Sequence, residues 1–441
     1  MKKFLFEQTD NAPLVVFRIF FGFLLACETL GAVLTGWVKA NFIEPEFTFS
    51  HIGMEWLQPL PDCGMYVYFS IMALLGIMVM LGYKYRFGII SFTILWAGVY
   101  FMQKTSYNNH YYLLLLVSLT MCFLPANRYK SMDVAKKPEL LSYSMPAWCR
   151  WVMVAQISIV YFFATVAKFY PAWLDGSFTF SLLAESIPQG IWNDAFVNKP
   201  FALFIAYSGI LFDLLVVPLL LYRKTRFPAL VASLIFHIFN SITLKIGIFP
   251  FFALTFVLFM YPPEDIRKFF LKKKPRLFTP TETEEGKTAF FYFFVPFLIL
   301  QFALPLRHHF IKGDVLWTEE GHRLSWRMML RSRSGYTNFT IKDKATGETL
   351  QYDLTEKLTS KQRRVMEANP DMIWQMAQRM KKHFAKEGKD VAIYANSRVS
   401  VNSGPSLALI DPETDLASAE WNYFGHCPWI ILYDNDNNPV K

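Results

Sequence analysis

The chain has 441 residues, of which 53% are hydrophobic, 17% aromatic and only 18% charged, with a net charge of +9. Soluble domains average about 25% charged residues, so this composition excludes a single soluble globule and a disordered chain. Residues 1–305 hold 25 basic and 18 acidic residues in short clusters between apolar runs, whereas residues 306–441 hold 19 and 17 without such clustering. We therefore predict a transmembrane domain over 1–306 and a water-exposed domain over 307–441.

Nine apolar segments have about the length needed to cross a bilayer. Spanning about 30 Å of hydrocarbon takes roughly 20 apolar residues in a helix. The segments lie near residues 13–35, 65–82, 87–103, 110–126, 151–168, 201–222, 227–246, 248–262 and 289–306. The predicted fold is a polytopic α-helical membrane protein of about nine spans.

The distribution of Lys and Arg predicts the orientation, because loops on the cytoplasmic side carry the excess of basic residues. With the N-terminus in the cytoplasm, the inner segments carry 19 basic residues and the outer segments carry five. This places 307–441 outside the cytoplasm and explains the net positive charge without a nucleic-acid partner. The compact length favours a bacterial inner membrane over the endoplasmic reticulum, although Asn338-Phe339-Thr340 is a glycosylation sequon.

The C-terminal domain shows both strand and helix patterns. Residues 324–353 alternate apolar and polar side chains around a turn signal at 345–348, which predicts a hairpin. Residues 359–385 have a helical period, and 391–402 and 428–433 are typical of strands. We expect an extramembrane, β-rich α+β domain.

Neither a disulfide framework nor a metal site is indicated by the cysteines. The chain has five cysteines, which is an odd number, and no CxxC pair or zinc-ligand spacing occurs among them. They are Cys27, Cys63, Cys122, Cys149 and Cys427. No metal cofactor is therefore predicted.

Ionisable side chains inside the predicted spans are candidate functional residues, because a buried charge in a membrane costs several kcal/mol unless it is paired or solvated. The set is Arg18, Glu28, His110, Lys168, Asp213, His237 and Lys245. Structural alternatives exist for most of them. Arg18 and Asp213 are candidates for a structural ion pair, Glu28 and Lys245 for snorkelling to the interface, and His237 for a hydrogen-bonded packing residue.

Two short segments on the predicted outer side combine polar groups of chemical interest. The segment 104–110 ends in Asn109 and His110, which offer an amide and an imidazole to one small cavity. The segment 161–168 ends in Lys168, which is flanked by Tyr and Phe residues. Desolvation disfavours an ammonium, and a neutral amine is a base; the alternative is a snorkelling interfacial lysine.

A third candidate is the pair His308-His309, which follows the ninth span and precedes Trp317 and the segment 325–329. Such a pair is compatible with metal binding, with acid–base chemistry or with anchoring at the interface. No carboxylate or Cys lies at ligand spacing, which disfavours metal. The neighbouring aromatic and Met residues predict the entrance of an apolar cofactor pocket.

Taken in order, these segments resemble the vitamin K-dependent γ-glutamyl carboxylases, including their shorter microbial members. The resemblance covers nearly the whole chain. The matching segments are 16–23, 80–86, 104–110, 160–162, 167–168, 173–176, 236–237, 240–241, 246–249, 304–305 and 325–329.

The resemblance implies a carbon–carbon bond-forming enzyme of the ligase or lyase type. In this family a lysine deprotonates vitamin K hydroquinone, reaction with O2 gives the epoxide, and the strong base formed on the way removes a glutamate γ-proton before CO2 adds. Lys168 matches that lysine. Asn109 and His110 match residues that hold the quinone oxygen. His237 and His308 match histidines that serve the carboxylation half of the reaction. Trp317 and Trp326 match residues on the side where the glutamate peptide binds. The pocket of the quinone is further expected to include Tyr161, Met328 and Met329.

Three hypotheses follow, all with the lipid bilayer and a quinone as partners. The first is a hydroquinone epoxidase coupled to γ-carboxylation of a glutamate-containing peptide or protein, with reduced vitamin K or a menaquinone-like quinone, O2 and CO2. The second keeps epoxidation without protein carboxylation. The third is a non-enzymatic quinone- or lipid-binding membrane protein. A dry membrane pocket suits the first two, because water would quench a strong base.

Overall fold

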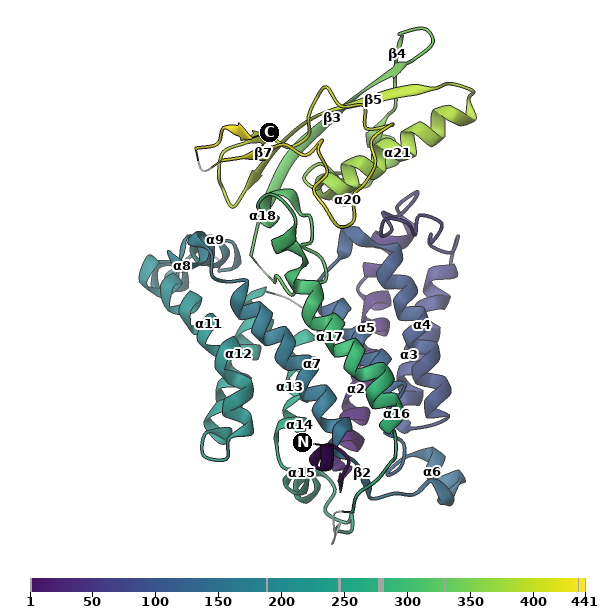
Figure 1. Cartoon of the computed structure of the whole chain (residues 1–441), viewed down its shortest axis with the longest axis vertical. Helices are drawn as coiled ribbons and strands as arrows, with labels where there is room; N and C mark the ends of the chain where they lie inside the picture. The colour runs from purple at the N-terminus through teal and green to yellow at the C-terminus, as the bar shows by residue number, and fades with distance from the viewer. Residues whose placement is uncertain are drawn as a thin grey trace. The chain divides into compact units, whose positions relative to one another are not determined.

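Apolar helices and a small β-sheet segregate into two units in the computed structural model (Figure 1), which describes residues 2–187, 189–244, 247–276, 281–328, 330–434 and 436–440. The first unit comprises residues 1–38, 63–100 and 110–302, and the second comprises 39–62, 101–109 and 303–441. The loops 39–62 and 101–109 thus belong to the second unit, although the predicted domain boundary at residue 306 places them in the transmembrane domain. Met329 and Lys245, both singled out from the sequence, lie outside the described residues.

Six helices within the described residues are long and apolar enough to cross a membrane. They are α2 (Ala12–Leu34), α3 (Gly64–Leu81), α4 (Tyr85–Met102), α7 (Ala147–Val166), α11 (Lys199–Leu221) and the continuous stretch Lys287–Phe310 made of α16 (Lys287–Ala289), η4 (Phe290–Phe294), α17 (Val295–Ala303) and η5 (Leu304–Phe310). The other three predicted spans are not among these six and fall on α5 (Asn109–Met121), α12 (Arg226–Leu244), whose apolar stretch is Arg226–Ile242, and the pair α13 (Phe249–Thr255) and α14 (Val257–Met260). Nine spans are therefore not confirmed, whereas a polytopic helical membrane protein is.

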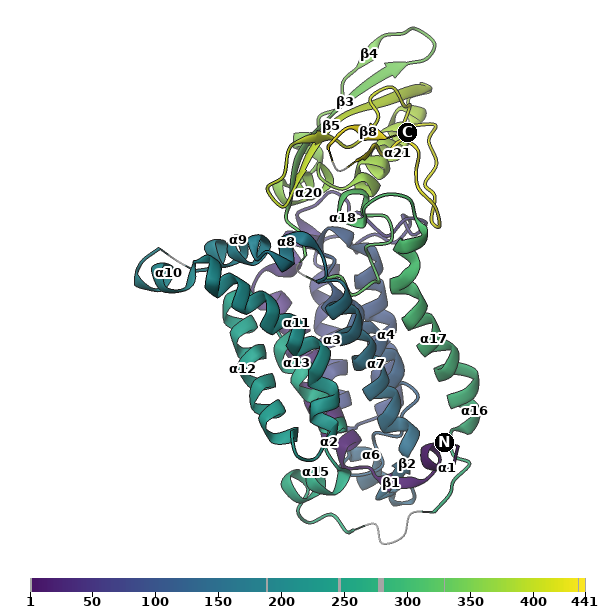
Figure 2. The ribbon, with the colours of Figure 1, turned by 60° about the vertical axis from the view of Figure 1, so that its left-hand side comes forward.

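Short elements complete the first unit and its loops. The helices are α1 (Lys2–Leu5), α6 (Met132–Lys136), η3 (Pro138–Leu140), α8 (Pro171–Leu174), α9 (Ser177–Ser186), α10 (Ile191–Phe196) and α15 (Pro263–Phe270). Strands β1 (Gln8–Asp10) and β2 (Ser144–Pro146) pair antiparallel. Figure 2 shows α7, α11, α12 and α13 as neighbours, and α11 packs against both α7 and α12 while α12 packs against α13. This helix group carries most of the candidate site.

Aromatic stacking fixes α13 and α14 against α2. The ring of Phe17 stacks on Phe21 and lies 4.9 Å from the ring of Phe259, and the ring of Phe21 lies 5.5 Å from that of Phe252. All four side chains are buried. Because aromatic pairs add to the stabilisation from burial, this stack holds the helix that begins at Phe249.

Helices α2 and α3 approach closely at two glycines. A Cβ atom on Gly22 would lie 2.6 Å from Met80 Cα and 2.8 Å from Gly76 O, and one on Gly76 would lie 2.7 Å from Ala26 N. Small residues at such contacts let two membrane helices pack backbone to backbone.

Substitution of Gly22 by alanine is expected to destabilise the protein by about 1–3 kcal/mol, because the methyl group forces the two backbones apart. The measurement is the thermal midpoint of the purified protein in detergent. Gly31→Ala is the matched control on the same helix, because nothing lies within 4 Å of its Cβ position. An equal loss of stability in both variants would contradict this account of the contact.

Arg18 is fully buried, but it does not form the predicted pair with Asp213. Its Nη2 donates to Lys130 O at 2.5 Å, whereas Asp213 binds Lys168. Gly82 adopts a left-handed conformation (φ 62°) beside the guanidinium, where a side chain would collide with it. The predicted pairing is wrong because the loop between α5 and α6 offers Arg18 a carbonyl acceptor, while Asp213 is engaged by Lys168.

The second unit is built on an antiparallel sheet of order β4-β3-β5-β6. Its strands are β3 (Arg333–Asp343), β4 (Thr349–Leu350), β5 (Val391–Val401) and β6 (Leu407–Ala408), and β7 (Leu432–Tyr433) pairs separately with β8 (Pro439–Val440). Its helices are η1 (Lys39–Ile43), η2 (Lys104–Ser106), α18 (Val315–Thr318), α19 (Leu354–Lys357), α20 (Ser360–Met366) and α21 (Pro370–Lys386). The predicted hairpin at 345–348 is confirmed by the β3–β4 pairing.

One face of α21 closes the core of this sheet. Met372, Met376 and Met380 are buried at helical spacing against apolar residues of β5 such as Ile393 and Val399. The helix predicted over 359–385 is divided in two, since Pro370 starts a new helix after Asn369. The mixture of helices and sheet agrees with the predicted α+β class.

Candidate active site

Lys168 forms a buried ion pair with Asp213. Its Nζ lies 2.5 Å from Asp213 Oδ2 and also donates to Ala164 O at 3.1 Å. Both residues are only 7% exposed. The Lys168 Nζ lies 5.4 Å from the ring centroid of Trp173, and a Cβ on Gly209, one turn before Asp213, would lie 3.9 Å from Lys168 Cε, an ordinary contact. The lysine thus has the dry surroundings expected from the sequence, together with a carboxylate that the sequence did not assign to it.

A second polar pair connects α7 to α12. The hydroxyl of Tyr161, two turns before Lys168, lies 3.2 Å from His237 Nε2. His237 Nδ1 is buried and has no hydrogen-bond partner among the described residues. The ring of Phe212, adjacent to Asp213, lies 6.0 Å from that of Tyr161 and 5.8 Å from that of His237. Helices α7, α11 and α12 therefore hold both pairs together.

The imidazole of His110 belongs to the same helix group through Phe249. The two rings stack with centroids 3.7 Å apart, and the ring of Phe249 lies 6.4 Å from that of His237. His110 Nδ1 is buried and, within the part of the chain described, lacks a hydrogen-bond partner. The neighbouring Tyr111 interacts with the carboxyl of Glu28. The first unit thus contains two imidazoles, each with a buried ring nitrogen that has no hydrogen-bond partner among the described residues.

Asn109 belongs to the second unit, where its amide is tied to the loop around residues 324–327. Its Nδ2 donates to Arg327 O at 3.2 Å, and its Oδ1 accepts from the hydroxyl of Tyr107 at 3.2 Å. The same Tyr107 oxygen accepts from Leu324 N at 2.9 Å. Tyr107 therefore positions both Asn109 and this loop.

His308 also lies in the second unit. Its Nε2 is 3.4 Å from Arg327 Nη1, its ring stacks near that of His309 with centroids 4.0 Å apart, and its Nδ1 is buried without a partner in the described chain. A Cβ on Gly321 would lie 2.8 Å from His308 Cβ, so this glycine lets the loop pass directly over the imidazole.

The two tryptophans assigned to the peptide side are packing residues in this conformation. Trp317 Nε1 donates to Ile431 O at 2.7 Å, and its ring meets that of Tyr433 edge to face. Trp326 is completely buried, which leaves no surface of its ring for a peptide. Met328 is half-buried. A role of these residues in binding stays a prediction.

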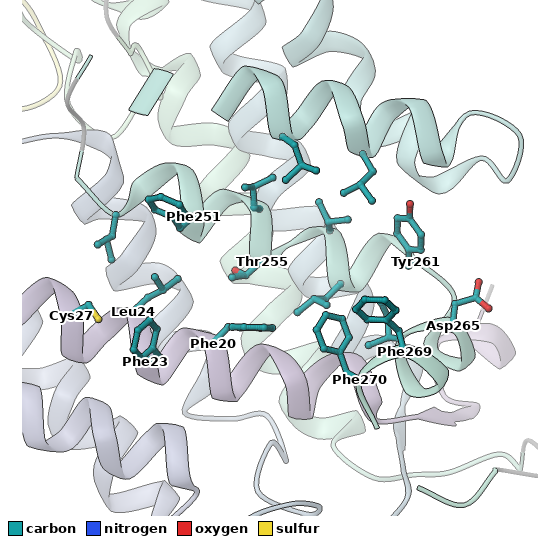
Figure 3. Close-up of a pocket in the computed structure, with 17 residues that line it drawn as sticks. Phe20, Phe23, Leu24, Cys27, Phe251, Thr255, Tyr261, Asp265, Phe269 and Phe270 are labelled. Atoms are coloured by element: carbon teal, nitrogen blue, oxygen red, sulfur yellow. The ribbon is translucent and has the colours of Figure 1, made fainter. Parts of the chain in front are cut away.

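The first unit contains an apolar cavity of about 890 Å³ between α2, α12, α13, α14 and α15. Figure 3 shows Phe20 and Phe23 of α2 on one side, with Phe251 and Thr255 of α13 near them and Tyr261, Asp265, Phe269 and Phe270 at one end. Leu234 of the lining lies one turn before His237, and Ile248 directly precedes Phe249. The cavity therefore shares α12 with His237 and α13 with Phe249.

Sequence comparison agrees with the resemblance read from the motifs. Residues 6–264 match the family model of the HTTM domain, and residues 286–436 match that of the lumenal domain of vitamin K-dependent gamma-carboxylase. The chain belongs to the vitamin K-dependent gamma-carboxylase family. It is an integral membrane protein, as the HTTM match and the apolar helices establish together. No solved structure matches the chain.

Proposed function

We propose that this carboxylase-family protein oxidises reduced vitamin K, or a menaquinone-like hydroquinone, with O2 to the epoxide and couples this reaction to γ-carboxylation of glutamate by CO2. The observation that carries the proposal is the buried ion pair of Lys168 and Asp213, in the same unit as the imidazoles of His110 and His237, whose Nδ1 atoms are buried without a hydrogen-bond partner among the described residues. Membership of the carboxylase family supports the overall reaction, and the burial of the Lys168 amine supports its role as the base.

The residues present fit a quinone with an isoprenoid tail. The cavity of about 890 Å³ has an almost entirely apolar lining suited to such a tail. His110 and His237 each keep one buried ring nitrogen that would hydrogen bond to a ring oxygen of the quinone. When bound, reduced vitamin K supplies, through its reaction with O2, a base strong enough to remove a glutamate γ-proton.

In this proposal Lys168 accepts the proton of the hydroquinone hydroxyl at its Nζ. The carboxylate of Asp213, 2.5 Å from this Nζ, holds the amine in place. Asp213 then stabilises the ammonium that forms when the amine accepts the substrate proton. Tyr161 and His237 provide a second site for a proton on the same helices.

The remaining assignments extend this proposal to the second unit. Asn109 would bind the quinone oxygen, His308 would serve the carboxylation half, and Trp317 and Trp326 would lie on the peptide side. Met328 and Met329 would line the quinone entrance. We further propose a cytoplasmic N-terminus, an extracytoplasmic domain over 307–441 and a bacterial inner membrane as the location, because 19 basic residues fall on the inner side and five on the outer.

Two alternatives have specific support. The burial of Trp326 favours an epoxidase without protein carboxylation, since it removes one peptide contact. The ion pair of Lys168 favours a non-enzymatic quinone- or lipid-binding protein, since a lysine held permanently in a structural ion pair would not act as a base.

One assay separates the three. The purified protein is given reduced vitamin K, O2, a glutamate-containing peptide and labelled bicarbonate, with a reaction lacking the quinone as control. We expect epoxide and labelled peptide together. Epoxide without label would replace the proposal by the epoxidase alone, and quinone binding without epoxide would leave only the binding protein.

A further inference from the structure

The second unit contains a small polar cavity that the proposed chemistry does not use. Its volume is about 150 Å³, which suits a few waters or a carboxylate group but not a quinone with its tail. Its charged lining residues are Lys104, Arg307, Glu319, Glu320, Arg323 and Asp371. All of them belong to the second unit.

One carboxylate in this cavity faces two cations. Lys104 Nζ and Arg323 Nη1 both lie 2.6 Å from the same oxygen, Asp371 Oδ2. Lys104 and Asp371 are each only 2% exposed. Burial lowers the pKa of Lys104 to about 8, even though the carboxylate of Asp371 opposes this shift. The group of three therefore carries one surplus positive charge in a place where water compensates poorly.

The other acidic residues of the lining are already engaged. Glu319 binds Arg331 through both oxygens and lies 3.7 Å from Arg333 Nη1. Glu320 accepts from Cys427 N at 2.7 Å and lies 2.7 Å from His426 Nδ1.

The nearest further carboxylate, that of Glu55, is on an exposed residue and accepts hydrogen bonds from Gly53 N and from Gln375 Nε2. Within the described residues, Lys104 and Arg323 form their ion pairs with Asp371, whereas Glu55 and Glu319 act on them only at longer range.

The backbone beside the cavity is strained. Glu319, Leu324 and Trp326 have φ values of 62°, 64° and 58°, a region that residues with large side chains rarely adopt. Arg323 lies inside this segment and is held by Asp371, while Leu324 N is held by Tyr107. Strain of this kind persists where surrounding contacts enforce it, and it concentrates at binding sites. The strained segment presents the arginine to the cavity.

We propose that this cavity binds a carboxylate-class anion through Lys104 and Arg323, with Asp371 holding the two cations in place. Both Nη atoms of Arg323 already donate to Asp371, so the anion would meet the remaining N–H donors of this guanidinium together with the point charge of Lys104. Two sources share this chemistry, namely an acidic side chain of a peptide substrate and free bicarbonate. Only the first of these rests on the proposed function.

Binding is measured by the thermal shift and by calorimetry of the full chain in detergent, without any quinone, so that failure here leaves the epoxide assay untouched. The probes are a short acidic peptide, sodium bicarbonate and, as the reference, sodium chloride at equal ionic strength. We expect the wild type to bind one of the two carboxylate-class anions and to show no comparable shift with chloride. A response to the peptide alone identifies the substrate as the source, and a response to bicarbonate alone identifies the free anion.

Arg323→Gln is expected to weaken that binding at least about tenfold, because it removes the guanidinium yet leaves Lys104 paired with Asp371. Lys104→Gln is the second variant, since it keeps the pair of Arg323 and Asp371, and Arg323→Lys should be intermediate. Arg364→Gln, an exposed arginine on α20, is the matched control. A wild type that binds neither anion, or Gln variants that bind as the wild type does, would overturn the proposal.

Discussion

Alanine at position 168 is expected to lower epoxide formation by about 10²- to 10⁴-fold, the usual contribution of a positioned general base. The side chain of Lys168 is buried and reaches Asp213 on the neighbouring helix, so the substitution removes the amine together with its ion pair. The measurement is the rate of epoxide formation by the purified protein from reduced vitamin K and O2. The substitution should leave quinone binding unchanged, which separates loss of the base from loss of the pocket.

Asp213→Asn tests whether Lys168 acts as a base or only as one member of a structural ion pair. Without the carboxylate, Lys168 Nζ loses the partner that holds it and that stabilises the ammonium formed in the reaction, so the rate of epoxide formation should fall. Lys199→Ala, an exposed lysine at the start of α11, is the matched control and should leave the rate unchanged. Full epoxide formation in Lys168→Ala would show that the ion pair is only structural.

The sequence identified most members of the membrane site, but not their partners. Lys168, Asp213, His110 and His237 stood out because ionisable groups are costly inside apolar segments. Hydropathy gives no distances, so Asp213 was matched with Arg18 on charge alone, whereas the helices bring it to Lys168. Phe249 ends the matching segment 246–249, but nothing in the sequence places its ring between the two imidazoles.

The second unit was harder to predict for a related reason. Alternation and turn residues gave the β3–β4 hairpin and β5, because these depend on local pattern. The loops 39–62 and 101–109 join this unit through long-range contacts that composition does not encode. Arg323 and Asp371 lie in a segment of ordinary charge content, where nothing in the sequence separates a buried ion pair from an exposed one.

Glutamine at position 319 is expected to destabilise the second unit by about 3–5 kcal/mol, the usual effect of removing one partner of a buried ion pair. Glu319 is 6% exposed and faces both Arg331 and Arg333, which would be left without their carboxylate. Burial alone would raise the pKa of Glu319, but Arg331, His322 and Arg333 lower it to about 2. The measurement is thermal unfolding followed by tryptophan fluorescence, because Trp326 is buried nearby.

The lowered pKa of Glu319 also fixes a pH dependence with a definite sign. Since the unfolded carboxyl titrates near 4.5, its stabilising contribution is complete above that pH and is lost as the pH falls towards 2. The wild type should therefore lose on the order of 3 kcal/mol from this group over that window, and Glu319→Gln should show a correspondingly flatter acid limb. Glu348→Gln, an exposed residue in the β3–β4 turn, should melt as the wild type does at every pH. If Glu319→Gln kept both the neutral-pH midpoint and the acid limb of the wild type, the two arginines would not depend on this carboxylate.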